Sequence, residues 1–144
     1  MSPETFFSLA SAFAALGWLV LAAGAIAKRD FLYGTLAGRV WPYGLAAAYG
    51  LLILFFWGRA QGGFDSLAHV QQLFSSPWLL MAGWVHYLAF DLFVGAWITG
   101  QVIARGLPRL ALVALLPLTF LFGPIGLLGY FFTQLAFERR EVMA

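Results

Sequence analysis

Long apolar stretches separated by short polar connections run along the whole chain. Four of them carry few or no charged residues, and they cover Phe6–Ala27, Val40–Gly58, Trp78–Ala104 and Leu110–Phe137. A helix needs about 20 mostly apolar residues to cross the hydrocarbon layer of a membrane, and each stretch meets that length. The pattern therefore predicts an all-α polytopic membrane protein, a bundle of four transmembrane helices in which residues 1–144 form a single transmembrane domain.

The composition agrees with a lipid environment. Hydrophobic residues make up 62% of the chain and charged residues 10%, with a mean hydropathy of +0.87. Soluble domains carry about 25% charged residues, so the lipid bilayer itself is the first expected partner. The basic residues form no block or stripe, which argues against a nucleic-acid partner. We expect an integral protein of a bacterial inner membrane and leave homo-oligomerisation open.

The connection between the second and third stretches has its own helical pattern. Gly62 and Gly63 open it, and Asp65 or Ser66 is placed to cap a following helix. Apolar side chains then fall near one face, at Phe64, Leu67, Val70 and Phe74. This spacing predicts a short interfacial helix between the second and third transmembrane helices.

Basic residues suggest an orientation. With four crossings, five of them fall on one side, at Lys28, Arg29, Arg39, Arg105 and Arg109. Three fall on the other side, at Arg59, Arg139 and Arg140. Because cytoplasmic connections are enriched in Lys and Arg, we expect both termini on the non-cytoplasmic side.

The fourth stretch combines small residues with prolines. Gly123, Gly126 and Gly129 are spaced for close helix packing, which matters where lipid offers little hydrophobic drive between helices. Pro117 and Pro124 remove backbone hydrogen bonds and predict a kink. We expect an apolar cavity between the third and fourth helices, open laterally to lipid.

The third stretch contains the residue that best indicates chemistry. Asp91 lies roughly 20 Å along the helix from Trp78, near the middle of the bilayer. An ionised Asp at that depth costs about 2.5–3.5 kcal/mol, so such residues face protein or water and mark functional sites. The bland alternative is that Asp91 only links helices through a hydrogen bond.

Neighbouring residues define the candidate site. Tyr87 and Trp84 precede Asp91 by four and seven residues and share its helical face, so we expect Tyr87 to hydrogen-bond to Asp91. His86 projects about 140° away around the helix, and either converges on one ligand from the other side of a groove or meets another helix. The candidate catalytic residues are His86, Asp91 and Tyr87. The candidate ligand-pocket residues are Trp84, Phe90 and Pro124.

Other chemistries find little support in the residues. The chain has no cysteine and only two histidines, and no carboxylate shares the face of His86 at ligand spacing, so we expect no metal site. Phosphate-binding loops and dinucleotide fingerprints are missing from the sequence, and we expect no cofactor.

Two stretches resemble a known family. The run Gly83–Gly95, containing Trp-Val-His-Tyr-Leu-Ala-Phe-Asp-Leu-Phe, and the run Leu121–Leu128 are similar to the signature stretches of the ABA4-like (abscisic-acid-deficient-4-like) family. These are small four-helix membrane proteins whose plant members are associated with neoxanthin formation. The resemblance implies a carotenoid or related isoprenoid substrate, with His86 and Asp91 as the functional positions.

The leading hypothesis is therefore a membrane enzyme or enzyme component that acts on a carotenoid or apocarotenoid. Formation of an allene from an epoxide is redox-neutral and requires an acid and a base, which a buried carboxyl and an imidazole can supply. One alternative is a pigment-binding or assembly subunit without catalysis. Another is a small proton-coupled carrier, in which an intramembrane Asp is also expected.

Overall fold

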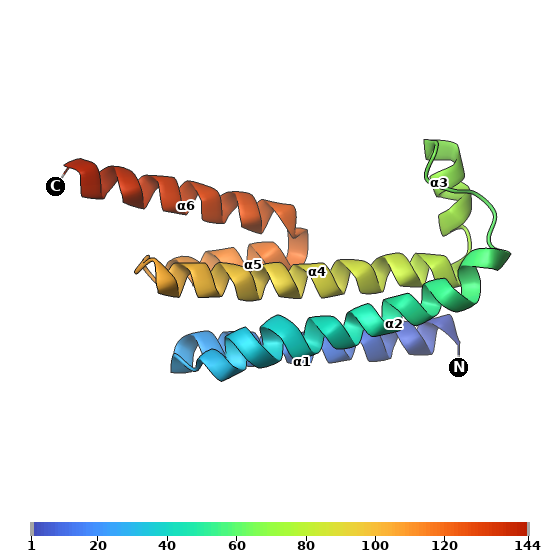
Figure 1. Ribbon diagram of the computed structural model, residues 1–144, viewed down its shortest axis with the longest axis horizontal. Helices are drawn as coiled ribbons and strands as arrows, with labels where there is room; N and C mark the ends of the chain where they lie inside the picture. Colours follow the sequence, from blue (N-terminus) through green and yellow to red (C-terminus); the bar gives the residue numbers. More distant parts are fainter. Residues whose placement is uncertain (1, 144) are drawn as a thin grey trace.

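The computed structural model describes residues 2–143, which form helices and connections without any strand (Figure 1). The elements in chain order are α1 (Pro3–Ala27), a π-helical segment η1 (Phe31–Val40), α2 (Trp41–Phe56), a 3₁₀ turn η2 (Trp57–Arg59), α3 (Leu67–Phe74), α4 (Pro77–Ala104), α5 (Ala111–Phe122) and α6 (Pro124–Met143). Three described segments are long and apolar enough to cross a membrane, namely Pro3–Ala27, Phe31–Arg59 and Pro77–Ala104.

Local sequence signals explain the helix boundaries. The side chain of Ser2 accepts a hydrogen bond from the Thr5 amide at the start of α1, and Pro77 occupies the first turn of α4, where its missing amide hydrogen costs little. Pro42 follows the wide turns of η1. In an α-helix its ring would collide with the carbonyl four residues earlier, and the wider π-helical turns relieve that collision.

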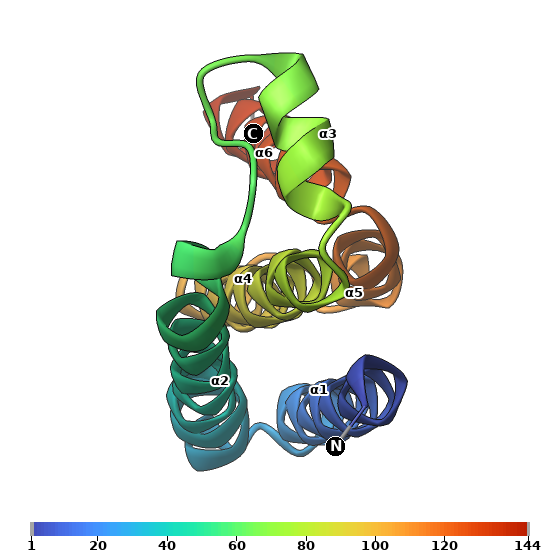
Figure 2. The ribbon, with the colours of Figure 1, turned by 90° about the vertical axis from the view of Figure 1, so that its right-hand side faces the viewer.

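Helix α4 is the centre of the molecule. It contacts α1, η1, α2, α3, α5 and α6, and in the end view it lies between α2 on one side and α5 on the other (Figure 2). Within its apolar stretch 56% of the residues are buried, against 28% in α1 and 17% in the segment containing α2. Chemistry placed on α4 is therefore surrounded by protein, while α1 and α2 keep broad faces for lipid.

The fourth predicted crossing is not one helix. Helix α5 runs beside α4 for about half its length, and α6 then returns in the opposite direction (Figure 1). The twelve residues of α5 span about 18 Å, which is too short for a hydrocarbon layer of about 30 Å. The expectation of four crossing helices is therefore replaced by three segments of crossing length and a helical hairpin, which we call the α5–α6 hairpin.

Glycines make this reversal fit. Gly123 adopts φ 38°, a conformation that residues with a Cβ atom rarely adopt, and Pro124 then starts α6. A Cβ atom added to Gly126 would lie 2.6 Å from the Cα atom of Thr119, so the two helices touch through backbone. The kink expected at Pro124 is in fact a complete change of direction.

The hairpin changes where charges and termini lie. The start of α1 and the end of α6 lie at opposite ends of the bundle, an arrangement that places them on opposite sides if the bundle spans the membrane (Figure 1). The expected common side of the termini is therefore not supported by the fold. Arg105 at the end of α4 pairs with Glu138 of α6 at 3.5 Å. Six of the eight basic residues now belong to the end of the bundle where α1, α4 and α6 finish, namely Lys28, Arg29, Arg105, Arg109, Arg139 and Arg140. Arg39, expected in the connection after the first stretch, lies inside the Phe31–Arg59 segment.

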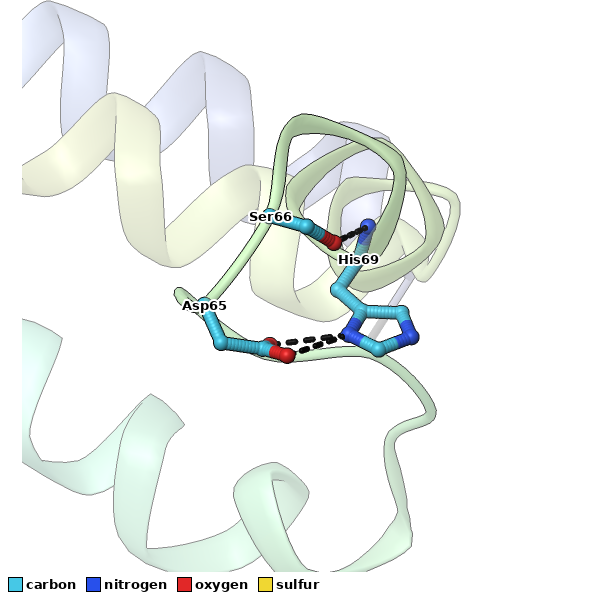
Figure 3. Close-up of polar contacts among 3 residues, drawn as sticks. All are labelled: Asp65, Ser66 and His69. Carbon is cyan, nitrogen blue, oxygen red and sulfur yellow. Dashed lines mark hydrogen bonds and ion pairs between the residues drawn. The ribbon is translucent and has the colours of Figure 1, made fainter.

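The predicted short helix before α4 is present as α3. The Ser66 hydroxyl accepts a hydrogen bond from the His69 amide, with the two atoms 3.2 Å apart. The Nδ1 atom of His69 lies 2.8 Å from a carboxylate oxygen of Asp65 (Figure 3). Phe64 and Leu67 beside this pair are exposed, as an apolar face meeting a membrane surface requires. The interfacial position of α3 stays a prediction.

Candidate functional site

Asp91 lies in the middle of α4, directly against the turn of the α5–α6 hairpin. Its residue surface is 7% exposed, and a Cβ atom on Gly123 would lie 3.2 Å from its Cγ atom. The Asp91 Oδ2 atom is shielded from solvent and has no hydrogen-bond partner among the described residues. Buried polar groups are nearly always paired, so this carboxyl departs from ordinary packing, as do Arg109 Nη1 and the Tyr130 hydroxyl among the described residues.

Tyr87 holds the end of α5. Its hydroxyl lies 3.0 Å from the carbonyl oxygen of Leu121 and 3.3 Å from that of Phe120, and donates its hydrogen to them. The last carbonyls of any helix lack partners within the helix, and at mid-membrane depth no water replaces them. The Tyr87 hydroxyl therefore caps the end of α5, and the hydrogen bond expected between Tyr87 and Asp91 stays a prediction.

A groove lies beside this cap, between the first halves of α1 and α4. It has a volume of about 720 Å³, and its lining includes Phe7, Phe74, Leu80, Met81, Trp84 and Tyr87. We call it the Trp84–Tyr87 groove. It lies between α1 and α4 rather than between the third and fourth predicted helices, because the α5–α6 hairpin covers only the second half of α4.

Aromatic contacts fix the wall of the groove. The rings of Trp84 and Tyr87 stack with centroids 5.4 Å apart, and Phe7 lies 5.4 Å from Trp84 on the other side. The Trp84 indole donates to the Ser11 hydroxyl of α1 at 3.0 Å. The ring planes therefore have fixed orientations, and they form a rigid apolar surface suited to a flat unsaturated ligand.

His86 opens on a different face of α4. It lines a pocket of about 270 Å³ together with residues of α2 and α3, and its ring lies 5.5 Å from that of Tyr49. Asp91 is not among the residues lining this pocket, so His86 and Asp91 do not share one cavity. Of the two geometries left open by the sequence, the structure has the one in which His86 meets another helix.

The other expected pocket residues are also separated. Phe90 is 58% exposed on the outside of α4, where its ring lies 4.6 Å from that of His86. Pro124 is exposed at the start of α6. Only Trp84 and Tyr87 line the large groove, and Phe90 and Pro124 lie outside all three described pockets.

Sequence reasoning missed that Asp91 lies against the turn of the α5–α6 hairpin. The signal was present in the Gly123-Pro124 pair, which is typical of a chain reversal as well as of a kink. Thr119 is fully buried in the same hairpin and donates its hydroxyl to the carbonyl of Leu115 at 2.7 Å. Among residues 2–143, no group of three His, Cys, Asp or Glu side chains is arranged to hold a metal ion.

These features define a small helical membrane protein with a buried acid covered by a helical hairpin and an aromatic groove beside it. The model of the ABA4-like family, described as ABA DEFICIENT 4-like, matches residues 5–130. The chain therefore belongs to the ABA4-like family, as the Gly83–Gly95 and Leu121–Leu128 stretches predicted. Membership implies a role in carotenoid-related biosynthesis. No curated protein and no solved structure matches the chain.

Proposed function

We propose that this protein acts on a carotenoid or apocarotenoid that lies in the Trp84–Tyr87 groove. The observation that carries the proposal is the groove itself, with its volume of about 720 Å³ and its stacked aromatic wall. Binding sites for small ligands are typically 300–1,000 Å³, mostly apolar, with a few polar groups that orient the ligand. The polar side chains in the lining of this groove include Glu4, Ser8 and Tyr87.

The first chemistry to test is a redox-neutral isomerisation. An epoxide oxygen accepts a proton as its carbon–oxygen bond opens, and a neighbouring carbon loses a proton as the new double bond forms. The two proton transfers balance, so no electron donor or acceptor is required. Asp91 lies one helical turn behind Tyr87 and has an unpaired oxygen, which supports it as the group that gives or takes a proton.

The separate position of His86 reduces the number of candidate catalytic residues. His86 opens into the pocket beside α2 and α3, so we no longer place it on the same bond as Asp91. The working assignment has Asp91 as the acid or base and Tyr87 between Asp91 and the ligand. His86 keeps a separate role in the smaller pocket, where its ring packs against Tyr49.

A non-catalytic pigment-binding subunit is the second candidate, and one observation favours it. Tyr87 already caps α5, and Asp91 already lies against Gly123, so both side chains have structural tasks. The proton-coupled carrier comes third. The bacterial inner membrane stays a prediction, because the family is associated with plants.

The experiment is to purify the protein from carotenoid-producing cells and to identify the bound pigment. We expect the wild type to retain a carotenoid or apocarotenoid, and Trp84→Ala to retain roughly tenfold less, since aromatic contacts of this kind contribute about 1 kcal/mol or more each. Trp97→Ala is the matched control. Trp97 belongs to the same helix with similar exposure, 43% against 38%, but lies outside the groove. Equal losses from both variants, or no pigment in the wild type, would remove the groove as the binding site.

A further inference from the structure

A second groove lies on the other half of α1, and no step of the proposed function uses it. It has a volume of about 480 Å³ between α1 and α5, and its lining includes Trp18, Ala22, Lys28, Arg109, Leu112 and Phe120. We call it the α1–α5 groove. Its walls are apolar along most of their length, and two cationic side chains stand at one end.

Neither cation has an acidic partner at ion-pair distance in the described part of the chain. Among the described residues, neither Lys28 nor Arg109 forms an ion pair within 4 Å. The Arg109 Nη1 atom is also shielded from solvent and has no hydrogen-bond acceptor in the described part of the chain. A shielded guanidinium nitrogen without an acceptor is costly, and an anionic oxygen at this end of the groove would relieve that cost.

The backbone conformation at Lys28 is one that favours glycine, yet a lysine occupies it. Lys28 follows the last residue of α1 with φ 57° and ψ 36°, the left-handed conformation that glycine usually occupies at this position. It is the only non-glycine residue with positive φ in residues 2–143. Lysine rarely adopts this conformation, which is consistent with a role for its side chain.

The length of the groove matches one leaflet. Lys28 and Trp18 are ten residues apart on α1, which is about 15 Å along the helix axis. Half of a hydrocarbon layer of about 30 Å has the same thickness. Trp18 meets Phe120 at the far end, where the ring centroids are 5.3 Å apart, and this contact closes the groove near mid-membrane.

We propose that the α1–α5 groove is a specific site for an anionic phospholipid, with its phosphate on Lys28 and Arg109 and an acyl chain lying toward Trp18. The phospholipid comes from the leaflet at the basic end of the bundle, which the positive-inside rule identifies as the cytoplasmic side. Basic pockets between membrane helices on that side bind anionic headgroups. The proposal does not depend on the proposed function, because the two grooves share no lining residue.

The experiment is native mass spectrometry of the full chain in detergent with equal amounts of phosphatidylglycerol and phosphatidylcholine. We expect the wild type to retain phosphatidylglycerol with a preference of roughly tenfold or more. The double variant Lys28→Asn with Arg109→Gln should lose the preference; Asn at position 28 tolerates the left-handed conformation. The double variant Arg29→Gln with Arg39→Gln removes the same charge near the same end of the bundle, outside the groove, and should keep it.

Location and identity are tested in the same system. Phosphatidylglycerol with a brominated acyl chain should quench the fluorescence contributed by Trp18, measured as the difference from Trp18→Phe. Equal loss in both double variants, or no preference in the wild type, would overturn the site. Stronger displacement by farnesyl diphosphate than by phosphatidylglycerol would overturn the phospholipid assignment in favour of a prenyl diphosphate.

Discussion

Asp91, in the middle of α4, is the residue on which the assignment of a catalytic function depends. Asp91 is buried against Gly123 and has an oxygen atom without a partner, whereas Tyr87 has its hydroxyl fully engaged with the end of α5. The two residues are neighbours on one face of α4, yet their surroundings give them different tasks. The Asp91 carboxyl keeps an unpaired oxygen, whereas the Tyr87 hydroxyl caps the end of α5.

This difference predicts different outcomes for two conservative substitutions. Asp91→Asn keeps the shape of the side chain but cannot exchange a proton. We expect it to insert and to unfold at the wild-type temperature while losing conversion of carotenoid substrates by roughly a hundredfold or more, the usual scale of general acid–base catalysis. The measurement compares product formation in membranes with thermal unfolding of the purified protein.

Tyr87→Phe serves as the structural contrast. It leaves the carbonyls of Phe120 and Leu121 without a donor, and unsatisfied buried groups cost about 1–3 kcal/mol. We expect this variant to lose thermal stability, and to lose activity only to the extent that less folded protein is present. Full activity in Asp91→Asn, or a parallel loss of stability and activity in it, would contradict the catalytic assignment and favour a packing role for the carboxyl.

At the scale of helices, the α5–α6 hairpin determines the surroundings of Asp91. Gly126 allows the backbones of α5 and α6 to touch at Thr119, and Gly129 lies against Leu115 one turn further on. Gly50 in α2 provides an internal comparison, because no atom lies within 4 Å of the position of its missing Cβ. A glycine-to-alanine substitution can therefore be compared at Gly126, where the packing is tight, and at Gly50, where it is open.

We expect Gly126→Ala to destabilise the protein by about 1–3 kcal/mol, the usual cost of forcing an extra methyl group into tight packing. Gly50→Ala should instead be neutral or stabilising by up to about 1 kcal/mol, because alanine favours a helix over glycine. Thermal unfolding in one detergent measures both. A similar response at the two positions would mean that α5 and α6 do not approach as closely as the hairpin requires.

Helices of the first three stretches could be predicted because hydropathy and capping residues act locally. The run Trp78–Ala104 became α4 at Pro77–Ala104, and the Ser66 cap of α3 is formed. The reversal at Gly123 could not be predicted in the same way. Apolar residues continue from α5 into the first turns of α6, and a Gly-Pro pair fits a kink as well as a turn. Contacts distant in sequence, between Gly126 and Thr119 and between Gly123 and Asp91, decide the outcome.

Contacts between residues that are distant in the sequence also explain why the site was predicted only in part. The periodicity of α4 correctly grouped Trp84, Tyr87 and Asp91 on one face, because that grouping depends on a single helix. It gave no information on which neighbour covers each residue. The α5–α6 hairpin covers Asp91 and leaves Trp84 in a groove, so the three residues divide into a buried acid and an exposed aromatic wall.

For the whole molecule, the hairpin changes the expected topology. With four crossings, basic residues divide five to three between the two sides, which is a weak bias. With three segments of crossing length and a returning α6, six of the eight lie at one end, Arg39 lies inside the second segment and only Arg59 belongs to the other end. The fold therefore produces a much stronger agreement with the positive-inside rule than the sequence pattern alone suggested.

This asymmetry predicts a non-cytoplasmic N-terminus and a cytoplasmic C-terminus. The chain has no cysteine, so single cysteines can report each position without background. We expect a membrane-impermeant maleimide added to intact cells to label Ser2→Cys and Gly58→Cys, and to label Ala104→Cys and Ala136→Cys only after the cells are permeabilised. Ala136 is the decisive position, because a fourth crossing helix would carry it to the side of Ser2, whereas the α5–α6 hairpin returns it to the side of Ala104.

Total labelling in detergent controls for the reactivity of each cysteine. Labelling of Ala136→Cys from outside together with Ser2→Cys would contradict the hairpin and restore four crossings, and with them the weaker charge bias.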